Sequence, residues 1–485
     1  MGGKYAARRK KRGGRKAIIV LLVISAVLAL GIAGIWLFGN WEPPASAVEP
    51  TQTSAPTIPA PTQAPVNRIQ LQADVTPAPT EMPTEPPVEP TEPAREQKYQ
   101  VPEIRFYNSE STSMDEYVGV SIKIIDVYGD VVLEDDRCQW RFHGNSTKRV
   151  AKKPYKFKLS SEQDLFGMGA ADKWILLANA FDKTLIRNKL VFDLAAAMEI
   201  PYTSQCVFVE VYADDAYRGS YLLIEPAEVD KERVNLRMSQ NEFLLELEQP
   251  YRVPEGEIIT TPHLSVPLGV SNIDYLPEDQ RQYLMDLFDK AETALLSHDR
   301  EQIEQYFDLD TFLDMYIINE YSKNADTHIA STRFYVEDGV IHAGPPWDYD
   351  LSCGNDNEDS DYRHRWNGTR PSRTDGMYAC SLWWSELYKC DWFLEEFAQR
   401  YLQLQPVIVN LYQENELGQS RIEYLTTSIS GSIEHNFKKW SVSRRIYHLE
   451  RIADPTYELN LEFLQNWLKK RNEWILGEIQ KKGWV

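Results

Sequence analysis

The stretch from Ile318 to Asn355 has the sequence INEYSKNADTHIASTRFYVEDGVIHAGPPWDYDLSCGN and decides how the rest of the chain is interpreted. It begins with the end of a predicted helix and continues as a polar loop. A strand over Arg333–Val336, the turn pair Asp338-Gly339 and a second apolar run then predict a β-hairpin. Because a short hairpin folds its two ends back together, we expect the residues on either side of it to meet in space.

Acidic residues flank this predicted hairpin on both sides. Asp326 precedes it, and Asp348 and Asp350 follow it in the sequence WDYD. Carboxylates that converge at strand ends, beside a loop of serine, glycine and asparagine, suit a site for a divalent cation and a phosphate. The alternative is that Asp326 only caps a turn and that Asp348 and Asp350 are ordinary loop carboxylates. This stretch alone leaves both interpretations open.

Charge is distributed unevenly along the 485 residues, a length that suits one large or two ordinary domains. Residues 1–16 carry eight lysines or arginines and no acid, whereas the whole chain has a formal net charge of -20. A strongly acidic remainder repels the phosphate backbone of nucleic acids. We therefore expect no nucleic-acid partner.

The basic tail is followed by an apolar stretch, residues 17–38, in which Ser25 is the only ordinary polar side chain. At about 1.5 Å per residue these residues would span roughly 33 Å as a helix, enough to cross a bilayer core. The basic flank predicts a cytoplasmic N-terminus and an extracytoplasmic remainder. A cleaved signal peptide is the alternative, but its apolar region is usually shorter. We therefore expect a signal anchor and a single-pass protein of the cell membrane.

Residues 39–96 form a tract rich in proline and threonine. Pro43–Arg95 contains fourteen of the chain's 28 prolines and no aromatic residue, so it cannot build a core. We expect a disordered stalk. From Gln97 the composition becomes globular, and we assign residues 97–485 to one folded domain.

A small-residue turn and a lysine-bearing strand lie early in this domain. The turn Gly144-Asn145-Ser146-Thr147 leads directly into Lys152–Leu159 (KKPYKFKL). Alternation places Lys156 and Lys158 on the face opposite the apolar residues. Backbone N–H groups of such a turn can cradle phosphate oxygens, and a strand lysine can hold them. An ordinary hairpin loop and a solvated basic face are the alternatives.

The remaining periodicity predicts an α+β fold with a β-rich N-lobe, a helical C-lobe and the carboxylates where the lobes meet. A helix after Asp182 should bury Ile186, Leu190 and Leu194, and Arg187 should form a structural ion pair. Strands are predicted at 103–107, 118–127, 138–142, 173–179, 207–212, 217–224 and 243–247, and helices at 280–297, 309–323, 381–402, 406–412, 419–440 and 459–479.

The five cysteines fit no zinc-binding pattern. In an oxidising exterior Cys380 and Cys390 could pair. For Cys138 and Cys206 we favour isolated positions in the core.

Several motifs together resemble the spore-coat protein H (CotH) kinase family over about Glu103–Ile479. They are RFHGNSTKRVAKKPYKFKL, DLFGMGAADKWILLANAFDKTLIRNKLVFDLA, VEVYADDAYRGSYLLIE, FYVEDGVIHAGPPWDYDLSCGN and LEFLQNWLKKRNEWI. The resemblance implies an atypical protein-kinase-like two-lobe fold, and the predicted transmembrane helix and stalk lie outside the matching region. It also implies transfer of the γ-phosphoryl of ATP, with Mg²⁺ or Mn²⁺, to hydroxyls of surface or coat proteins.

The resemblance further implies roles for individual residues. Asp326 would be catalytic and would orient the acceptor hydroxyl. Asp348 would bind the metal, assisted by Asp350 or Asn355. The nucleotide would be held by Gly144, Asn145, Ser146, Lys153 and Lys156, of which Lys156 is the preferred phosphate ligand. A non-catalytic surface scaffold or adhesion protein with the same fold is the alternative function.

Overall fold

The computed structural model describes residues 95–144, 146–248, 258–271, 273, 275–357, 369–416, 418–444, 446 and 450–485. Its contacts divide the chain into two units, residues 1–88 and 89–485, and the described residues all lie in the second unit. The predicted basic tail (1–16), membrane helix (17–38) and nearly all of the stalk (39–96) lie outside the described residues. Within the described ranges, no helix combines the length and the apolar character needed to cross a bilayer.

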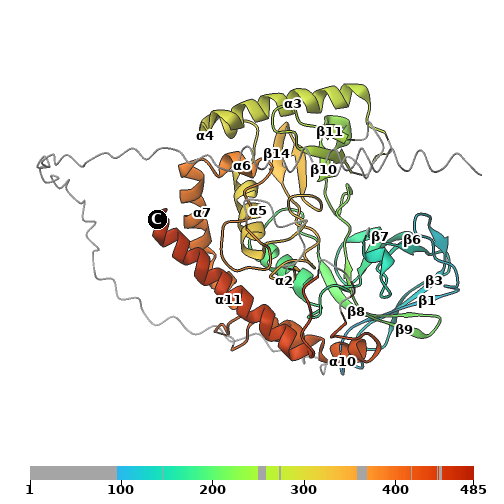
Figure 1. The fold of residues 1–485 in the computed structure, drawn as a ribbon. Helices are drawn as coiled ribbons and strands as arrows, with labels where there is room; N and C mark the ends of the chain where they lie inside the picture. Colours follow the sequence, from blue (N-terminus) through green and yellow to red (C-terminus); the bar gives the residue numbers. More distant parts are fainter. Residues whose placement is uncertain are drawn as a thin grey trace, which may run out of the picture. The chain divides into compact units, whose positions relative to one another are not determined.

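A nine-stranded sheet occupies about the first third of the described chain (Figure 1). Its strands are β1 (Glu103–Tyr107), β2 (Val118–Gly119), β3 (Ser121–Ile125), β4 (Val131–Asp135), β5 (Gln139–Phe142), β6 (Tyr155–Asp164), β7 (Ala170–Leu177), β8 (Cys206–Ala213) and β9 (Ala216–Ile224). They lie in the order β2-β5-β6-β7-β9-β8-β1-β3-β4, and every neighbouring pair is antiparallel except β1 with β8. The single strand predicted at 118–127 is therefore two strands, β2 and β3.

One face of this sheet carries an aromatic core. Trp140 of β5 stacks on Tyr155 of β6 with ring centroids 4.7 Å apart, and Phe106 contacts Phe157 edge-on. The alternation predicted for β6 is confirmed, because Tyr155 and Phe157 are buried and Lys156 is half-buried. Fully burying a phenylalanine contributes about 1.5–3 kcal/mol, so this cluster is a main source of the sheet's stability.

A second sheet contains the predicted hairpin. Its strands are β10 (Phe243–Leu247), β11 (Ile258–Thr260), β12 (Pro267–Val270), β13 (Arg333–Glu337) and β14 (Val340–Ala343), in the order β11-β12-β10-β13-β14. The predicted hairpin is β13–β14, and the predicted helical C-lobe contains this sheet as well. The strand at 243–247, predicted as part of the β-rich N-lobe, is β10 of the second sheet. Leu245 of β10 pairs with Phe334 of β13. Alternation identifies a strand but not the sheet it joins, because tertiary packing chooses the partner.

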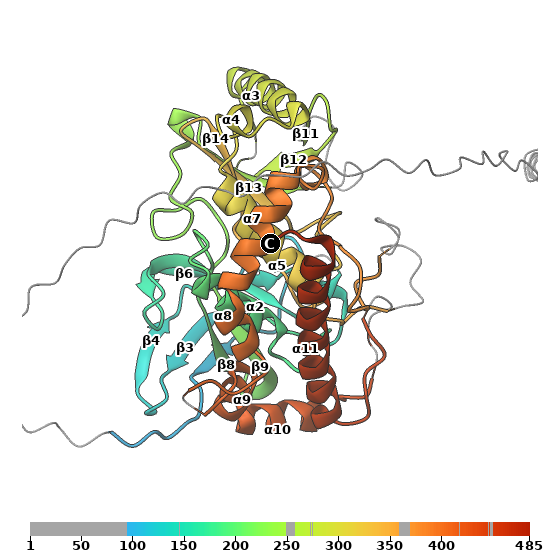
Figure 2. The ribbon, with the colours of Figure 1, turned by 90° about the vertical axis from the view of Figure 1, so that its left-hand side faces the viewer.

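Helices surround the second sheet and cover part of the first (Figure 1). They are α2 (Arg187–Ala197), α3 (Glu278–Ser297), α4 (Arg300–Ile303), α5 (Leu309–Ser322), α6 (Trp384–Leu387), α7 (Asp391–Gln403), α8 (Gln405–Asn410), α9 (Arg421–Ser428), α10 (Ser430–Lys439) and α11 (Tyr457–Lys482), with 3₁₀ turns η1 (Thr147–Arg149) and η2 (Met238–Gln240). The long C-terminal helix α11 packs against α5 and α8, and α10 packs against β9 (Figure 2).

Two helices predicted as continuous are interrupted. The predicted helix 381–402 is divided into α6 and α7 at Cys390, which has extended backbone (φ -93°, ψ 116°). The predicted helix 419–440 is divided into α9 and α10 at Ile429 (φ -123°, ψ 20°). Apolar spacing continues across both interruptions because the flanking helices cover one core, so periodicity alone does not reveal them.

All five cysteines are buried and carry free thiols. The suggested pairing of Cys380 with Cys390 is therefore not formed. Burial raises the pKa of the Cys138 and Cys206 thiols to about 12, which agrees with their expected place in the core and makes them unreactive.

Candidate functional site

The hairpin β13–β14 brings the two acidic segments together. Its turn residues Asp338 and Gly339 both have positive φ (48° and 80°), as a tight two-residue hairpin turn requires. Beyond the hairpin, the Ala325 N–H donates to the Leu351 carbonyl oxygen at 3.1 Å. Asp326 directly follows Ala325 in the sequence, and Asp350 directly precedes Leu351. These two candidate carboxylates therefore lie on segments that are hydrogen-bonded to each other.

Asp326 lies in a turn just after α5. The helix ends at Ser322 and is followed by Lys323, which has left-handed backbone (φ 46°). The Asp326 N–H then donates to Asn324 Oδ1 at 3.1 Å, and the Asp326 carbonyl oxygen accepts the N–H groups of Ile329 and Ala330, both at 2.9 Å. The backbone of Asp326 is thus held on both sides, while its half-buried side chain keeps contact with solvent.

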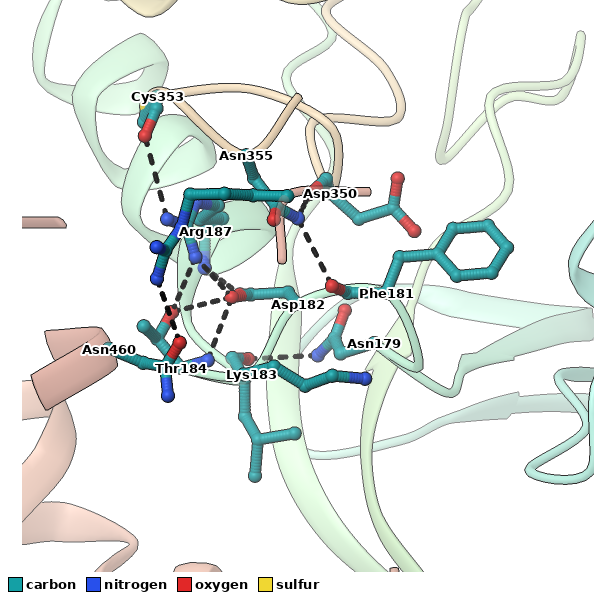
Figure 3. Close-up of polar contacts among 12 residues, drawn as sticks. Asn179, Phe181, Asp182, Lys183, Thr184, Arg187, Asp350, Cys353, Asn355 and Asn460 are labelled. Carbon is teal, nitrogen blue, oxygen red and sulfur yellow. Dashed lines mark hydrogen bonds and ion pairs between the residues drawn. The ribbon is translucent and has the colours of Figure 1, made fainter. Parts of the chain in front are cut away.

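The second acidic segment, residues 348–357, is held by side-chain amides. Asn355 Nδ2 donates to the carbonyl oxygens of Asp350 (2.6 Å) and Phe181 (3.1 Å). In Figure 3 the carboxylate of Asp350 points away from the amide of Asn355. Asp348 is half-buried and has left-handed backbone (φ 60°). The segment is therefore a fixed loop that carries three carboxylates, those of Asp348, Asp350 and the buried Asp356.

A buried ion pair supports this loop from below (Figure 3). The Asp182 carboxylate accepts the N–H groups of Thr184 and Arg187, both at 2.8 Å, and pairs with the Arg187 guanidinium. Arg187 Nε in turn donates to the Ser352 carbonyl oxygen at 3.1 Å. The expected structural ion pair of Arg187 is confirmed, and it joins the start of α2 to the second acidic segment.

Lys156 forms an ion pair that the sequence did not indicate. Its Nζ lies 3.3 Å from Glu228 Oε2, and Lys173 Nζ lies 3.4 Å from Glu228 Oε1. Burial lowers the pKa of Lys156, and the Glu228 carboxylate opposes that effect. In the sheet, Lys156 is opposite Ile175, which belongs to the same core as α2. Lys156 thus lies on the face of the sheet turned toward the helices.

The small-residue turn is compact. Gly144 has φ 79°, and a Cβ there would collide with Thr147 Oγ1. Asn145 lies outside the described residues, and Ser146 leads into η1. The Lys153 ammonium lies over the Phe142 ring, 5.3 Å from its centroid. The turn leads directly to Arg149 and the basic pocket described next.

A pocket of about 500 Å³ is lined by Asp182 and by five cations: Arg149, Lys152, Lys183, Lys439 and Arg444. This set is called the basic pocket below. Lys152 Nζ donates to the Ser220 carbonyl oxygen at 2.6 Å, and burial lowers the pKa of Lys152 to about 7. Burial also lowers the pKa of Lys183, against the opposing effect of Glu450. Buried cations that have lost hydration favour an anionic ligand.

A small apolar cluster connects the basic pocket to the acidic segments. Phe181, Ala325 and Leu351 form it, and Val150 and Ile446 pack against it. Ala325 and Leu351 belong to the two acidic segments, and the Phe181 carbonyl oxygen accepts from Asn355 Nδ2 of the second segment. Val150 and Ile446 also line the basic pocket. Sequence reasoning missed Lys152, Lys183 and Glu228, and no spacing pattern distinguishes these residues from surface charges.

The donor set around the second acidic segment fits a hard divalent cation. Within the described ranges, no three His, Cys, Asp or Glu side chains are grouped to hold a metal. Mg²⁺, however, usually takes only one or two carboxylates and completes its octahedron with water and phosphate oxygens. Asp348 and Asp350 supply such carboxylates. Asn355 uses its Nδ2 to fix the loop, and its Oδ1 is the atom of this side chain that could act as a metal ligand.

Comparison with known proteins gives one family. A family model described as CotH kinase protein matches residues 140–475, more than half of the chain and every candidate site residue named above. No curated protein matches the chain.

Proposed function

The chain belongs to the CotH kinase family, and from this premise we propose that it is a protein kinase that transfers the γ-phosphoryl of ATP to a protein hydroxyl. The observation that carries the proposal is the joining of the two acidic segments, with Ala325 bonded to Leu351 between Asp326 and Asp350. Phosphoryl transfer needs one carboxylate near the acceptor and others near the metal, which this arrangement supplies.

In the proposed reaction, a bond forms between the acceptor oxygen and the γ-phosphorus while the bond from that phosphorus to ADP breaks. Asp326 accepts a hydrogen bond from the acceptor hydroxyl, orients it and takes its proton. Asp348 and Asp350, with Asn355, would hold Mg²⁺ or Mn²⁺, which would supply charge neutralisation at the phosphates. The protein's main contribution is positioning.

Two groups of cations support nucleotide binding. The Lys156–Glu228 pair resembles the lysine–glutamate pair that protein kinases assemble beside the phosphates. The basic pocket offers Lys152 and Lys183 within a volume suited to a small ligand. We assign phosphate binding to Lys156 and include Lys152 as the main competitor for that role.

We further propose that residues 17–38 anchor the protein in the cell membrane, with the kinase domain extracytoplasmic at the end of the stalk. The apolar stretch and its basic flank support this placement.

The test is transfer of label from [γ-³²P]ATP by the purified full chain to a mixture of surface proteins, with Mg²⁺ or Mn²⁺. We expect label on protein in wild type and transfer that is slower by roughly a hundredfold or more in Asp326→Asn and in Asp348→Asn. A scaffold would transfer no label in any of the three, and that result would refute the proposed activity.

A further inference from the structure

The backbone of Asp348 is in a conformation that is uncommon for residues other than glycine. Its φ of 60° lies in the left-handed region, which residues other than glycine enter at a cost in free energy. Such a conformation persists where surrounding contacts enforce it, and it is frequent at functional sites. The contacts that enforce it here come from two buried asparagines.

Asn324 and Asn188 hold the two ends of one peptide group. Asn324 Nδ2 donates to the Asp348 carbonyl oxygen at 2.9 Å, and the N–H of the same peptide, on Tyr349, donates to Asn188 Oδ1 at 2.7 Å. Asn324 follows α5, Asn188 lies on α2, and each is 2% exposed. The peptide after Asp348 is therefore held from α2 and from the segment that follows α5, which sets the direction in which the Asp348 side chain leaves the backbone.

In both asparagines the side-chain Nδ2 donates one hydrogen bond and the Oδ1 accepts another. Asn324 Oδ1 accepts the Asp326 N–H at 3.1 Å, so this one side chain bonds to both candidate acidic residues. Asn188 Nδ2 donates to Asn179 Oδ1 at 3.0 Å. A carbonyl only accepts and an N–H only donates, so the orientation of the Asn324 amide follows from its partners. An aspartate at position 324 would have no donor for the Asp348 carbonyl.

Asn324 is itself held by its neighbours. The Tyr378 hydroxyl donates to the Asn324 carbonyl oxygen at 3.0 Å, and Tyr378 is fully buried. The Lys323 ammonium, also buried, donates to the Asp375 carbonyl oxygen. Asn324 is thus fixed through its backbone as well as through its side chain.

We propose that Asn188 and Asn324 are positioning residues that set the place of the metal-binding carboxylate of Asp348 relative to Asp326. This inference rests on the proposed function. It makes the metal affinity of the site depend on two residues that do not contact the metal.

The experiment measures Mn²⁺ affinity by calorimetric titration of the full chain in the presence of a non-hydrolysable ATP analogue. It compares wild type with Asn324→Asp and Asn188→Ala. Asn472→Asp is the matched control. Asn472 is equally buried and donates to Gln405 Oε1 (2.9 Å) and the Tyr412 hydroxyl (3.0 Å), but it contacts neither acidic segment. Melting temperature and label transfer are measured on the same samples.

We expect Asn324→Asp and Asn188→Ala each to weaken Mn²⁺ binding roughly 10- to 100-fold, the usual effect of removing an outer partner of a metal ligand. Asn472→Asp should lower the melting temperature but change Mn²⁺ affinity less than about twofold. Because both asparagines act on one peptide, the double variant should lose less than the product of the two single effects. If Asn324→Asp does not fold, Tyr378→Phe tests the same support and should weaken Mn²⁺ binding in the same direction.

If Asn324→Asp binds Mn²⁺ as tightly as Asn472→Asp while wild type is active, the proposed positioning role is wrong. The proposed function would not be affected by that result. Strictly multiplicative effects in the double variant would also overturn the positioning role. A wild type that neither transfers label nor binds nucleotide with Mn²⁺ would overturn the proposed function, and the positioning role with it.

Discussion

Glu320 on α5 and Arg471 on α11 form an ion pair in which neither side chain is exposed to solvent. Arg471 also donates to the carbonyl oxygens of Thr374 (2.9 Å) and Gly376 (3.0 Å), and the Glu320 carboxylate accepts the Tyr378 N–H. The pair therefore joins the last helix of the chain and the segment 374–378 to the helix that leads to Asp326. The C-terminal helix is part of the support of the candidate site.

Arg471→Met should lower the free energy of unfolding by about 3–5 kcal/mol, because it leaves the Glu320 carboxylate buried without its cation. Urea denaturation measures this loss. Arg300→Met is the control, since the pair of Arg300 with Glu304 is about half exposed and should contribute about 0–1 kcal/mol. Equal losses of unfolding free energy in the two variants would show that the buried pair stabilises the fold no more than the exposed pair does.

Asp348→Asn should abolish the metal dependence of nucleotide binding and leave the fold intact. Asparagine tolerates the left-handed backbone of this position as well as aspartate does, so the variant removes charge without adding strain. Nucleotide affinity with and without Mn²⁺, measured by calorimetry, checks this. Asp338→Asn, on the exposed hairpin turn, is the control. Unchanged metal dependence in Asp348→Asn would transfer the metal role to Asp350.

Asp326→Asn should lower turnover by roughly a hundredfold or more, the usual effect of one positioned acid–base group, and leave nucleotide affinity nearly unchanged. The reason is that a carboxylate bonded to the acceptor hydroxyl acts mainly in the transition state. Label transfer and nucleotide affinity are measured side by side. Turnover that hardly changes would place the acceptor-orienting group elsewhere in the site.

Lys156→Met should weaken ATP binding about tenfold or more, because the half-buried ammonium loses its charge-assisted bonds to phosphate. Lys158→Met is the control on the same strand, since Lys158 is more exposed and pairs with Asp172 at 3.5 Å. Equilibrium binding of a fluorescent ATP analogue measures both. If Lys156→Met binds ATP like wild type and Lys152→Met does not, the phosphates are held in the basic pocket.

The basic pocket predicts a proton linkage. The pKa of Lys152 is about 7 instead of its ordinary 10.5, so its amine is mostly neutral above pH 7 and mostly charged below it. A bound polyphosphate would raise that pKa again. If nucleotide enters the basic pocket, binding at pH 8 should therefore take up a proton, which calorimetry in buffers of different ionisation enthalpy detects. If wild type takes up no proton on binding nucleotide, phosphate binding at Lys152 is contradicted. Proton uptake that persists in Lys152→Met would contradict it as well.

Much of the local structure follows from the sequence, because its causes are short-range. The turn pair Asp338-Gly339 and its flanking alternation determined the hairpin β13–β14, and this hairpin brings Asp326 near Asp350. Alternation in β6 likewise determined that Lys156 points to the opposite face of the sheet from Tyr155 and Phe157. The interrupted helices were missed because one continuous core covers both sides of each interruption.

Contacts between distant segments were decided only by the tertiary structure. The partner of Lys156 is Glu228, 72 residues later, and the Tyr349 N–H is held by Asn188, 161 residues earlier. Such pairs leave no periodic signal, since any polar side chain on a suitable surface has the same local pattern. Only when sheets and helices pack do burial and loss of water force each buried donor to find its acceptor, and this requirement selects the residues that hold the site.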